Sequence, residues 1–381
     1  MNEWLQARNI LAVRLDNIGD VVMLGPALRA VKETSPGASI TLLGTPGGTT
    51  GAALLPWVDD VIVWRPVWQD VGNRMAFDPA REMELIRLLS ERNFDAALVF
   101  TSFSQTPHPP GYVCYLAGIP LRAGESKEFG GSVLSTQLQP APDELHQVER
   151  NLRLVEHLGF VARHRELVVA VPDDAHAAVP SLLRSAGLDP DAPYVLLHPG
   201  ASAKARRYPP ERFREVARSL SERGMPVLVT GVEREAEIVR QVAGSTPRVG
   251  TLVGDTTMPE YAALVETAAL VMCGNTLPLH LADALDTPSV ILYSGTDYEE
   301  QWRPRRTPTR LLRVPTPCHP CYLFECPIGQ PCLDIPPEQV VDAALHLVEH
   351  ADEIRRLPTR PSIRAGANGH LQPSTAEGAR L

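Results

Sequence analysis

The chain has 381 residues and a formal net charge of −9, with 44% hydrophobic and 21% charged residues. This composition is typical of a soluble globular protein, and the length exceeds what one hydrophobic core usually serves, so we expect two domains. The acidic balance argues against nucleic-acid binding through a broadly basic surface. The sequence shows no apolar run near the roughly 18–20 residues that a membrane-spanning helix requires.

The first residues, Met1–Arg8, lack the charged-then-apolar order of a signal peptide. We therefore expect a cytoplasmic protein. In that compartment the six cysteines are more often thiols or metal ligands than disulfides.

Short apolar runs alternate with amphipathic segments along the first half of the chain. Pro26 should delay or kink the helix that begins near Val21. The first turn carries only Gly19, so it is not the GxGxxG fingerprint of a dinucleotide-binding oxidoreductase. We expect strands at 10–13, 40–43, 61–64, 96–100 and 168–172, and helices at 21–31, 79–92, 112–116 and 144–158.

The second half repeats this alternation. Composition shifts to Pro, Asp and Ala between residues 170 and 190, which indicates a domain boundary. We predict an α/β protein with one Rossmann-like domain over 1–175, a second over 176–356 and a disordered tail over 357–381. The expected strands of the second half are 194–197, 226–231, 270–272 and 290–293, and the expected helices are 233–242, 261–268 and 340–350.

Three loops could carry chemistry, because ligands bind at the carboxyl ends of the strands in sheets of this type. In the first loop, Asn17–Asp20, the carboxylate of Asp20 stands where a helix begins. It could cap that helix, or it could act as a general base for a hydroxyl group.

The second loop runs from His198 to Pro209 and contains Ser202, Lys204 and Arg206. Arginine forms forked hydrogen bonds with phosphate oxygens, and lysine adds a point charge. The alternative is a solvated basic loop without a ligand.

The third loop lies within residues 271–285, where an apolar run, a turn and an apolar-periodic segment predict strand, loop and helix. The unpaired N–H groups at the start of that helix favour an anion such as phosphate. An ordinary turn with a buried His280 is the alternative. Ser294–Asp297 follows the next strand and should lie on the same rim.

Together these motifs resemble glycosyltransferase family 9, the heptosyltransferase family, in order along residues 9–350. The segments that carry the resemblance are Gly19-Asp20 at a helix start, His198–Ser202 with Arg206–Pro209, Asn275–Ala282, and Gly295–Asp297 with Trp302–Pro304.

The resemblance implies the GT-B fold, two Rossmann-like domains facing an inter-domain cleft, and an inverting transfer of a heptose-like sugar. The donor would be a nucleotide sugar, ADP-heptose in the type member, and the acceptor a hydroxyl of a lipopolysaccharide core or another lipid-linked glycan. Asp20 matches the family's catalytic base. The residues assigned to the donor by their match to the family or their place in these loops are Ser202, Lys204, Arg206, Asn275, Thr276, His280, Thr296 and Asp297.

The resemblance further implies that catalysis requires no metal or other cofactor, which agrees with the absence of a DxD pair at a strand end. The first domain would bind the acceptor, with His108 and Arg122 as candidate contacts. A lipid-linked acceptor would bring the cytoplasmic enzyme into transient, peripheral contact with the inner face of the plasma membrane.

Two residues depart from the family pattern. Asn275 stands where the family usually has an acidic residue, and Leu277 stands where it usually has glycine. An amide donates as well as accepts hydrogen bonds, whereas a carboxylate only accepts them. The departures therefore leave the identity of the donor open. They also leave two alternatives to a transferase, a nucleotide-sugar epimerase or hydrolase of GT-B architecture and a non-catalytic nucleotide-sugar binding protein.

Four cysteines, Cys318, Cys321, Cys326 and Cys332, lie in one Pro-rich loop. The first pair has the C-x2-C spacing of zinc and iron–sulfur sites, but the second pair does not. A structural metal, free thiols and a disulfide all remain open here. The other two cysteines, at positions 114 and 273, are expected in the core.

Overall fold

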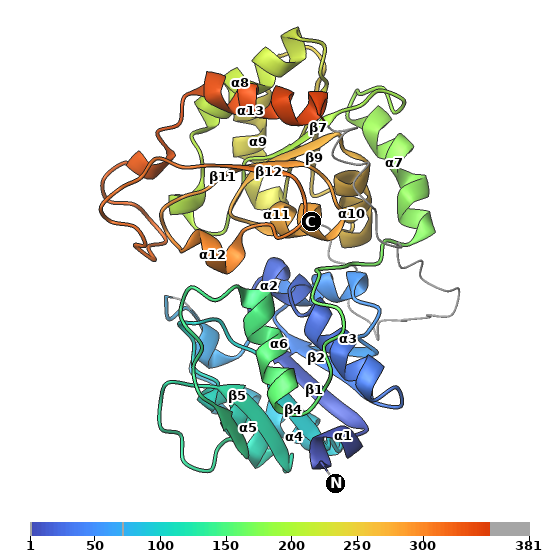
Figure 1. The fold of residues 1–381 in the computed structure, drawn as a ribbon, viewed down its shortest axis with the longest axis vertical. Coiled ribbons are helices and arrows are strands. Elements are labelled where there is room, and N and C mark those ends of the chain that lie inside the picture. The colour runs from blue at the N-terminus through green and yellow to red at the C-terminus, as the bar shows by residue number, and fades with distance from the viewer. Residues whose placement is uncertain (1, 71, 351–381) are drawn as a thin grey trace. The chain divides into compact units, whose positions relative to one another are not determined.

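The computed structural model describes residues 2–70 and 72–350, and the predicted tail over 357–381 lies outside these residues. The chain divides into two compact units, one reaching to Val168 and the other beginning at Val169. Each unit is built on its own six-stranded sheet with helices packed against it (Figure 1).

The sheet of the first unit is entirely parallel and has the order β3-β2-β1-β4-β5-β6. The order therefore reverses between β1 and β4, the place where doubly wound sheets bind their ligands. At this point Val13 of β1 lies in register with Leu43 on one side and Val99 on the other. The strands are β1 Asn9–Arg14, β2 Ser39–Gly44, β3 Asp60–Val63, β4 Ala96–Val99, β5 Leu121–Glu125 and β6 Thr136–Leu138.

The helix predicted over 21–31 is two helices, α2 (Ile18–Val22) and α3 (Gly25–Thr34). Pro26 lies in the first turn of α3, where its missing N–H costs no hydrogen bond, so the predicted effect of this proline is confirmed. The other helices of the unit are α1 Glu3–Gln6, α4 Pro79–Glu91, α5 His108–Leu116 and α6 Gln147–His157, and its 3-10 turns are η1 Gly48–Leu54 and η2 Val67–Gln69.

The strand predicted at 168–172 is wrong. This segment is extended but pairs with neither sheet, and it runs into helix α7, which begins at Asp173. Val169 and Ala170 are nonetheless buried. An apolar run of this length can be covered by side chains without a strand partner, and periodicity alone does not tell the two cases apart.

The sheet of the second unit is also parallel and has the order β12-β11-β10-β7-β8-β9. This is the same doubly wound arrangement, with its reversal between β7 and β10. Both units therefore confirm the predicted Rossmann-like α/β class. The strands are β7 Val195–His198, β8 Val227–Gly231, β9 Val249–Val253, β10 Leu270–Gly274, β11 Ser289–Leu292 and β12 Thr309–Leu312.

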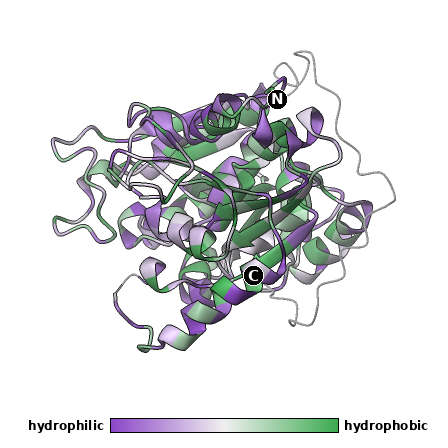
Figure 2. Ribbon diagram, turned by 90° about the horizontal axis from the view of Figure 1, so that it is seen from below, coloured by the Kyte–Doolittle hydropathy of each residue, from purple (hydrophilic) through white to green (hydrophobic). Residues whose placement is uncertain are grey.

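Helices of the second unit pack apolar side chains onto this sheet. The resulting core includes the fully buried residues Val195, Phe213 and Leu270. Figure 2 shows the hydrophobic colouring concentrated along the strands. The helices are α7 Asp173–Ser185, α8 Pro210–Glu222, α9 Ala236–Ala243, α10 Met258–Thr267, α11 Leu277–Ala284, α12 Glu299–Trp302 and α13 Pro337–Glu349, with 3-10 turns η3 Lys204–Arg206, η4 Glu233–Glu235 and η5 Pro331–Leu333.

Candidate functional site

At the switch point of the first unit, one buried arginine lies between two carboxylates. Arg14 is the last residue of β1 and its side chain is 0% exposed. Its Nε lies 2.9 Å from Oδ2 of Asp16, and its Nη2 donates to Oδ1 of Asp20 over 2.9 Å. A buried guanidinium keeps its charge and must be paired, so β1 ends in a cluster of one positive and two acidic groups.

Asp20 occupies the first turn of α2. Its Oδ2 accepts a hydrogen bond of 3.3 Å from the backbone N–H of Asn17, as one half of a capping box. The capping interpretation is therefore confirmed. The carboxylate is still 17% exposed, and each of its oxygens has a lone pair left. The role of general base remains a prediction that this geometry permits.

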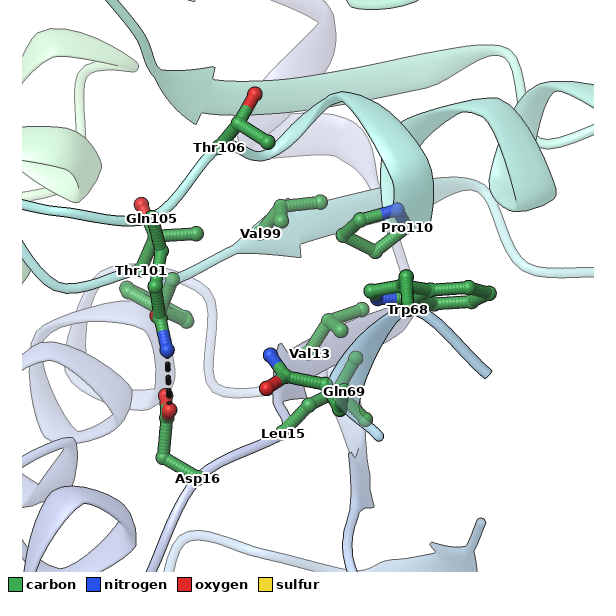
Figure 3. Close-up of a pocket in the computed structure, with 11 residues that line it drawn as sticks. Val13, Leu15, Asp16, Trp68, Gln69, Val99, Thr101, Gln105, Thr106 and Pro110 are labelled. Carbon is green, nitrogen blue, oxygen red and sulfur yellow. Dashed lines mark hydrogen bonds between the residues drawn. The ribbon is translucent and has the colours of Figure 1, made fainter. Parts of the chain in front are cut away.

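A pocket opens between the carboxyl ends of β1 and β4 (Figure 3). Its cavity volume is about 20 Å³, which is room for roughly one water molecule. Asp16 is the charged residue of its lining and points towards Gln105, whose Nε2 donates to Oδ1 over 2.5 Å. Burial raises the pKa of Asp16, and the charge of Arg14 opposes this rise. The lining residues are Val13, Leu15, Asp16, Trp68, Gln69, Val99, Phe100, Thr101, Gln105, Thr106 and Pro110.

At the switch point of the second unit, the loops after β7 and β10 meet. Nη2 of Arg206 contacts both carboxylate oxygens of Asp297, at 3.0 and 2.8 Å, and Nε of Arg206 donates to Oγ1 of Thr296 over 3.2 Å. Gly274 ends β10 directly beneath the loop, where a Cβ would lie 2.8 Å from the carbonyl oxygen of Arg206. Only glycine lets the two loops approach this closely.

Asn275 joins the same cluster from the turn after β10. Its Nδ2 donates to Oδ2 of Asp297 over 3.4 Å and to the hydroxyl of Tyr293 over 3.2 Å. Thr276 then precedes α11 without capping the helix through its side chain. Strand, turn and helix follow one another as predicted. In the first turn of α11, Pro278 has no N–H and the N–H of Leu279 donates to the carbonyl of Thr276 over 3.1 Å, which leaves the N–H of Leu277 for a ligand.

His280 lies within α11 and is buried. Burial, followed by the nearby charge of Arg206, lowers the pKa of His280 to about 3. Its imidazole is therefore neutral at physiological pH, and its ring meets that of Trp302 edge-on at 6.4 Å. The alternative interpretation of this loop, an ordinary turn with a buried His280, is therefore correct about the burial. His280 nevertheless lies close to the charged cluster of Arg206 and Asp297.

The structure thus brings five of the predicted donor residues together, at positions 206, 275, 280, 296 and 297. Ser202 and Lys204 belong to the same loop as Arg206 but are exposed. The ammonium of Lys204 forms an exposed ion pair of 2.7 Å with Glu325. An exposed pair of this kind contributes little and can be exchanged for a ligand.

The two predicted acceptor contacts lie in the first unit, around α5 and β5. Nε2 of His108 lies 3.0 Å from Oγ of Ser126. Arg122 is buried, donates to the backbone carbonyls of Val133 and Pro120 over 2.8 Å each, and stacks 5.1 Å from the ring of Tyr115. These contacts favour a structural role for Arg122, and acceptor binding by either residue remains a prediction.

The cysteine-rich loop packs against the loops that carry the donor cluster. The N–H of Cys321 donates to the carbonyl of Gly295 over 3.1 Å, and that of Ala205 donates to the carbonyl of Phe324 over 2.9 Å. The four thiols are free, and within residues 2–70 and 72–350 no three His, Cys, Asp or Glu side chains are grouped as metal ligands. The predicted structural metal therefore has no support here, whereas the core positions of Cys114 and Cys273 are confirmed.

Sequence reasoning missed Arg14, Asp16, Gln105 and Tyr293. Arg14 could have been found from the sequence, because it is a charged residue that directly follows the apolar strand 10–13. In the part of the chain that the structure describes, no helix is both long and apolar enough to cross a membrane.

A sequence model of glycosyltransferase family 9 (heptosyltransferase) matches residues 83–330. Lipopolysaccharide heptosyltransferase 3 of Escherichia coli K12 is 24% identical over 299 residues, which cover 75% of this chain and 82% of that protein. Among solved structures, the glycosyl transferase family 9 protein of Veillonella parvula aligns with a TM-score of 0.73 and 18% identity, over 90% of this chain and 97% of its own.

The ADP-heptose lipopolysaccharide heptosyltransferase II of Escherichia coli aligns with a TM-score of 0.72 and 21% identity, over 90% of this chain and 99% of its own. These structural likenesses establish the fold as GT-B, with its two Rossmann-like domains.

Proposed function

Because the chain belongs to glycosyltransferase family 9 (heptosyltransferase) and is a glycosyltransferase, we propose that it transfers heptose from ADP-heptose to a hydroxyl of a lipopolysaccharide-core glycan, inverting the anomeric configuration. The relatives named above support the sugar, the nucleotide and the acceptor class. The proposal rests on the side chains at the two switch points. The first switch point presents the carboxylate of Asp20, and the second presents the guanidinium of Arg206 beside the start of α11.

The second unit binds the nucleotide sugar in this proposal. Arg206 and the N–H of Leu277 at the start of α11 bind the diphosphate, because a planar guanidinium and a helix N-terminus both favour phosphate oxygens. Asp297 holds the guanidinium in place. Ser202 and Lys204 complete the donor loop, and Lys204 exchanges its exposed partner for a phosphate.

The first unit supplies the proton acceptor. Asp20 takes the proton of the acceptor hydroxyl while its oxygen forms a bond to the anomeric carbon of the heptose. The bond between that carbon and the diphosphate oxygen breaks on the opposite face, and ADP leaves with the bonding electrons. Arg206 stabilises the charge that develops on the leaving oxygen. One displacement of this kind inverts the anomeric centre and requires no cofactor.

The acceptor binds over the mouth of the pocket of Figure 3, which has room for one of its hydroxyl groups. Trp68 offers a ring face and an Nε1–H that is buried without a hydrogen-bond partner in the described chain. Gln69 and Gln105 add amides. Rings and neutral polar groups suit sugar hydroxyls. The enzyme works in the cytoplasm and reaches a lipid-linked acceptor at the inner face of the plasma membrane.

Two measurements test this function. Calorimetric titration with ADP-, GDP-, UDP- and dTDP-sugars should show selective binding of ADP-heptose. With a heptose-deficient lipopolysaccharide core added, NMR of the product should show the anomeric configuration opposite to that of the donor. Selective binding of another nucleotide sugar would contradict the donor. Turnover of ADP-heptose without any acceptor would instead favour an epimerase or hydrolase.

A further inference from the structure

Arg14 is shared by two acidic residues, and only one of them has a role in the reaction proposed above. The two contacts are equal in length, 2.9 Å to Asp16 and 2.9 Å to Asp20, and they use different nitrogens of one guanidinium. Arg14 has no exposed surface, and Asp16 and Asp20 are only 13% and 17% exposed, so solvent screens these contacts weakly. One buried cation therefore divides its interaction between two carboxylates.

We propose that Asp16 is a positioning residue of the transfer, which acts through Arg14 to orient the carboxylate of Asp20. The proposal rests on the assignment of Asp20 as the general base. Asp16 lines the pocket at the acceptor site, but its two carboxylate oxygens face Gln105 and Arg14, so this role requires no contact between Asp16 and a substrate.

The electrostatic argument follows from the arrangement of the three charges. The charged groups that act on Asp16 are Arg14 from β1 and Asp20 from α2, and the remaining partner is the neutral amide of Gln105. When Asp16 is ionised, it holds Nε of Arg14, so that Nη2 of the same guanidinium points at Asp20. When Asp16 is neutral, the attraction on Nε weakens, and the guanidinium is less firmly held towards Asp20.

The backbone of Asp16 is held as firmly as its side chain. Its carbonyl oxygen accepts a hydrogen bond of 2.8 Å from Oγ1 of Thr45, and a Cβ on Gly48 would lie 2.4 Å from the same oxygen. Gln105 fixes the carboxylate from the opposite loop and is itself held, because its Oε1 accepts from the N–H of Ser102 over 3.1 Å. Because both the backbone and the carboxylate of Asp16 are held in place, a change in the charge of Asp16 acts on Arg14 at a fixed distance.

Asp16→Asn tests the proposal because the amide has the same shape and keeps a hydrogen-bonding oxygen. With ADP-heptose and a heptose-deficient core acceptor, kcat should fall roughly 10–100-fold while the acceptor KM stays unchanged. Burial raises the pKa of Asp16, so the acidic limb of the wild-type kcat profile should include the protonation of Asp16, and Asp16→Asn should move that limb to lower pH. An unchanged acidic limb together with a raised acceptor KM would overturn the proposal, because Asp16 would then bind the acceptor directly.

Three further variants keep the test decisive. Asp16→Glu, which restores the charge, should recover the position of the acidic limb. Arg14→Lys should remove most of the effect of Asp16→Asn on that limb, because lysine cannot bridge both carboxylates. Asp60→Asn is the matched control, since Asp60 also pairs with an arginine but at an exposed site on β3. It should leave kcat and the profile unchanged.

A measurement without turnover separates this proposal from the function on which it rests. In protein labelled with ¹³C at the aspartate carboxyls, Asp16→Asn should shift the carboxyl resonance of Asp20 at neutral pH, whereas Asp60→Asn should leave it in place. An unmoved Asp20 resonance would overturn the positioning role even if the enzyme is active. A moved resonance in a protein that transfers no heptose would leave the positioning role standing and refute the proposed reaction.

Discussion

The two units have the same strand order but place different side chains at their switch points. At the β1/β4 switch point, Arg14 is 0% exposed and is surrounded by carboxylates, so the surface there is acidic. At the β7/β10 switch point, the side chain of Arg206 is 27% exposed, has a single carboxylate partner and lies beside the start of α11. The first arrangement suits proton acceptance and the second suits anion binding. Topology sets where a ligand binds, and a few side chains set which reaction follows.

The largest effect should come from removing the proposed base. Asp20→Asn keeps an oxygen that can accept from the N–H of Asn17, so the first turn of α2 should stay capped. Transfer should fall by about 10²–10⁴-fold, the usual contribution of general-base catalysis, while the ADP-heptose Kd from calorimetry stays unchanged. Transfer at the wild-type rate by this variant would contradict the assignment of proton acceptance to the first unit.

Arg206→Gln tests the assignment of anion binding to the second unit. The loss of a forked, charge-assisted contact should raise the Kd for ADP-heptose roughly 10–100-fold. Arg218→Gln is the matched control, because Arg218 forms an exposed ion pair with Glu222 on α8 and should leave the Kd unchanged. Equal effects of the two substitutions would show that general charge, and not this position, determines affinity.

Asn275→Asp tests the amide in the second cluster. A carboxylate at this position would stand 3.4 Å from that of Asp297, and two like charges at this distance repel each other. We expect about a tenfold rise in the ADP-heptose Kd, measured by calorimetry. The double variant Asn275→Asp/Asp297→Asn should recover part of this loss. If Asn275→Asp binds more tightly than the wild type, the amide does not serve the donor that we propose.

Gly274→Ala tests the close approach of the loops after β7 and β10. A Cβ 2.8 Å from the carbonyl oxygen of Arg206 forces the backbone apart, which should cost about 1–3 kcal/mol of unfolding free energy in urea titrations. Gly47→Ala is the matched control, because nothing lies within 4 Å of its Cβ position and its φ of −74° suits alanine. If the two variants are equally stable, the loops can separate freely.

The smallest effect at neutral pH concerns His280. Its pKa is lowered from 6.5 to about 3 in the folded protein, so below pH 6.5 the unfolded chain binds more protons than the folded one. Stability should fall as the pH drops from 6.5 towards 3, by at most ~1.4 kcal/mol per pH unit from this group. His280→Gln should show a shallower fall between pH 6.5 and 5 in urea titrations. A slope equal to that of the wild type would contradict the neutral imidazole.

Much of the fold followed from apolar runs in the sequence. Strands such as 10–13 and 270–272 are central in their sheets, are buried on both faces and are apolar throughout, so periodicity finds them. The strands that it missed, β5, β6, β9 and β12, lie on the outer side of each sheet and mix polar with apolar residues. Helix α7 was missed because Pro180 interrupts its pattern.

The candidate site was only partly predictable. Loop positions such as Asp20 and Arg206 followed from their place after buried strands. The sharing of Arg14 by two carboxylates depends on side-chain directions at the end of β1. The contact between Asp16 and Gln105 joins residues 89 positions apart. Such long-range partners are set by tertiary packing, which a single sequence does not reveal.

The division of labour between the two units can be tested in one measurement, hydrogen exchange of the full chain with and without ADP-heptose. Ligand contacts slow the exchange of the amides that they hold closed. We predict protection at residues 200–207, 274–280 and 295–298 of the second unit and none at 14–20 or 101–110 of the first. Protection at the first unit's loops, without any in the second, would contradict the account.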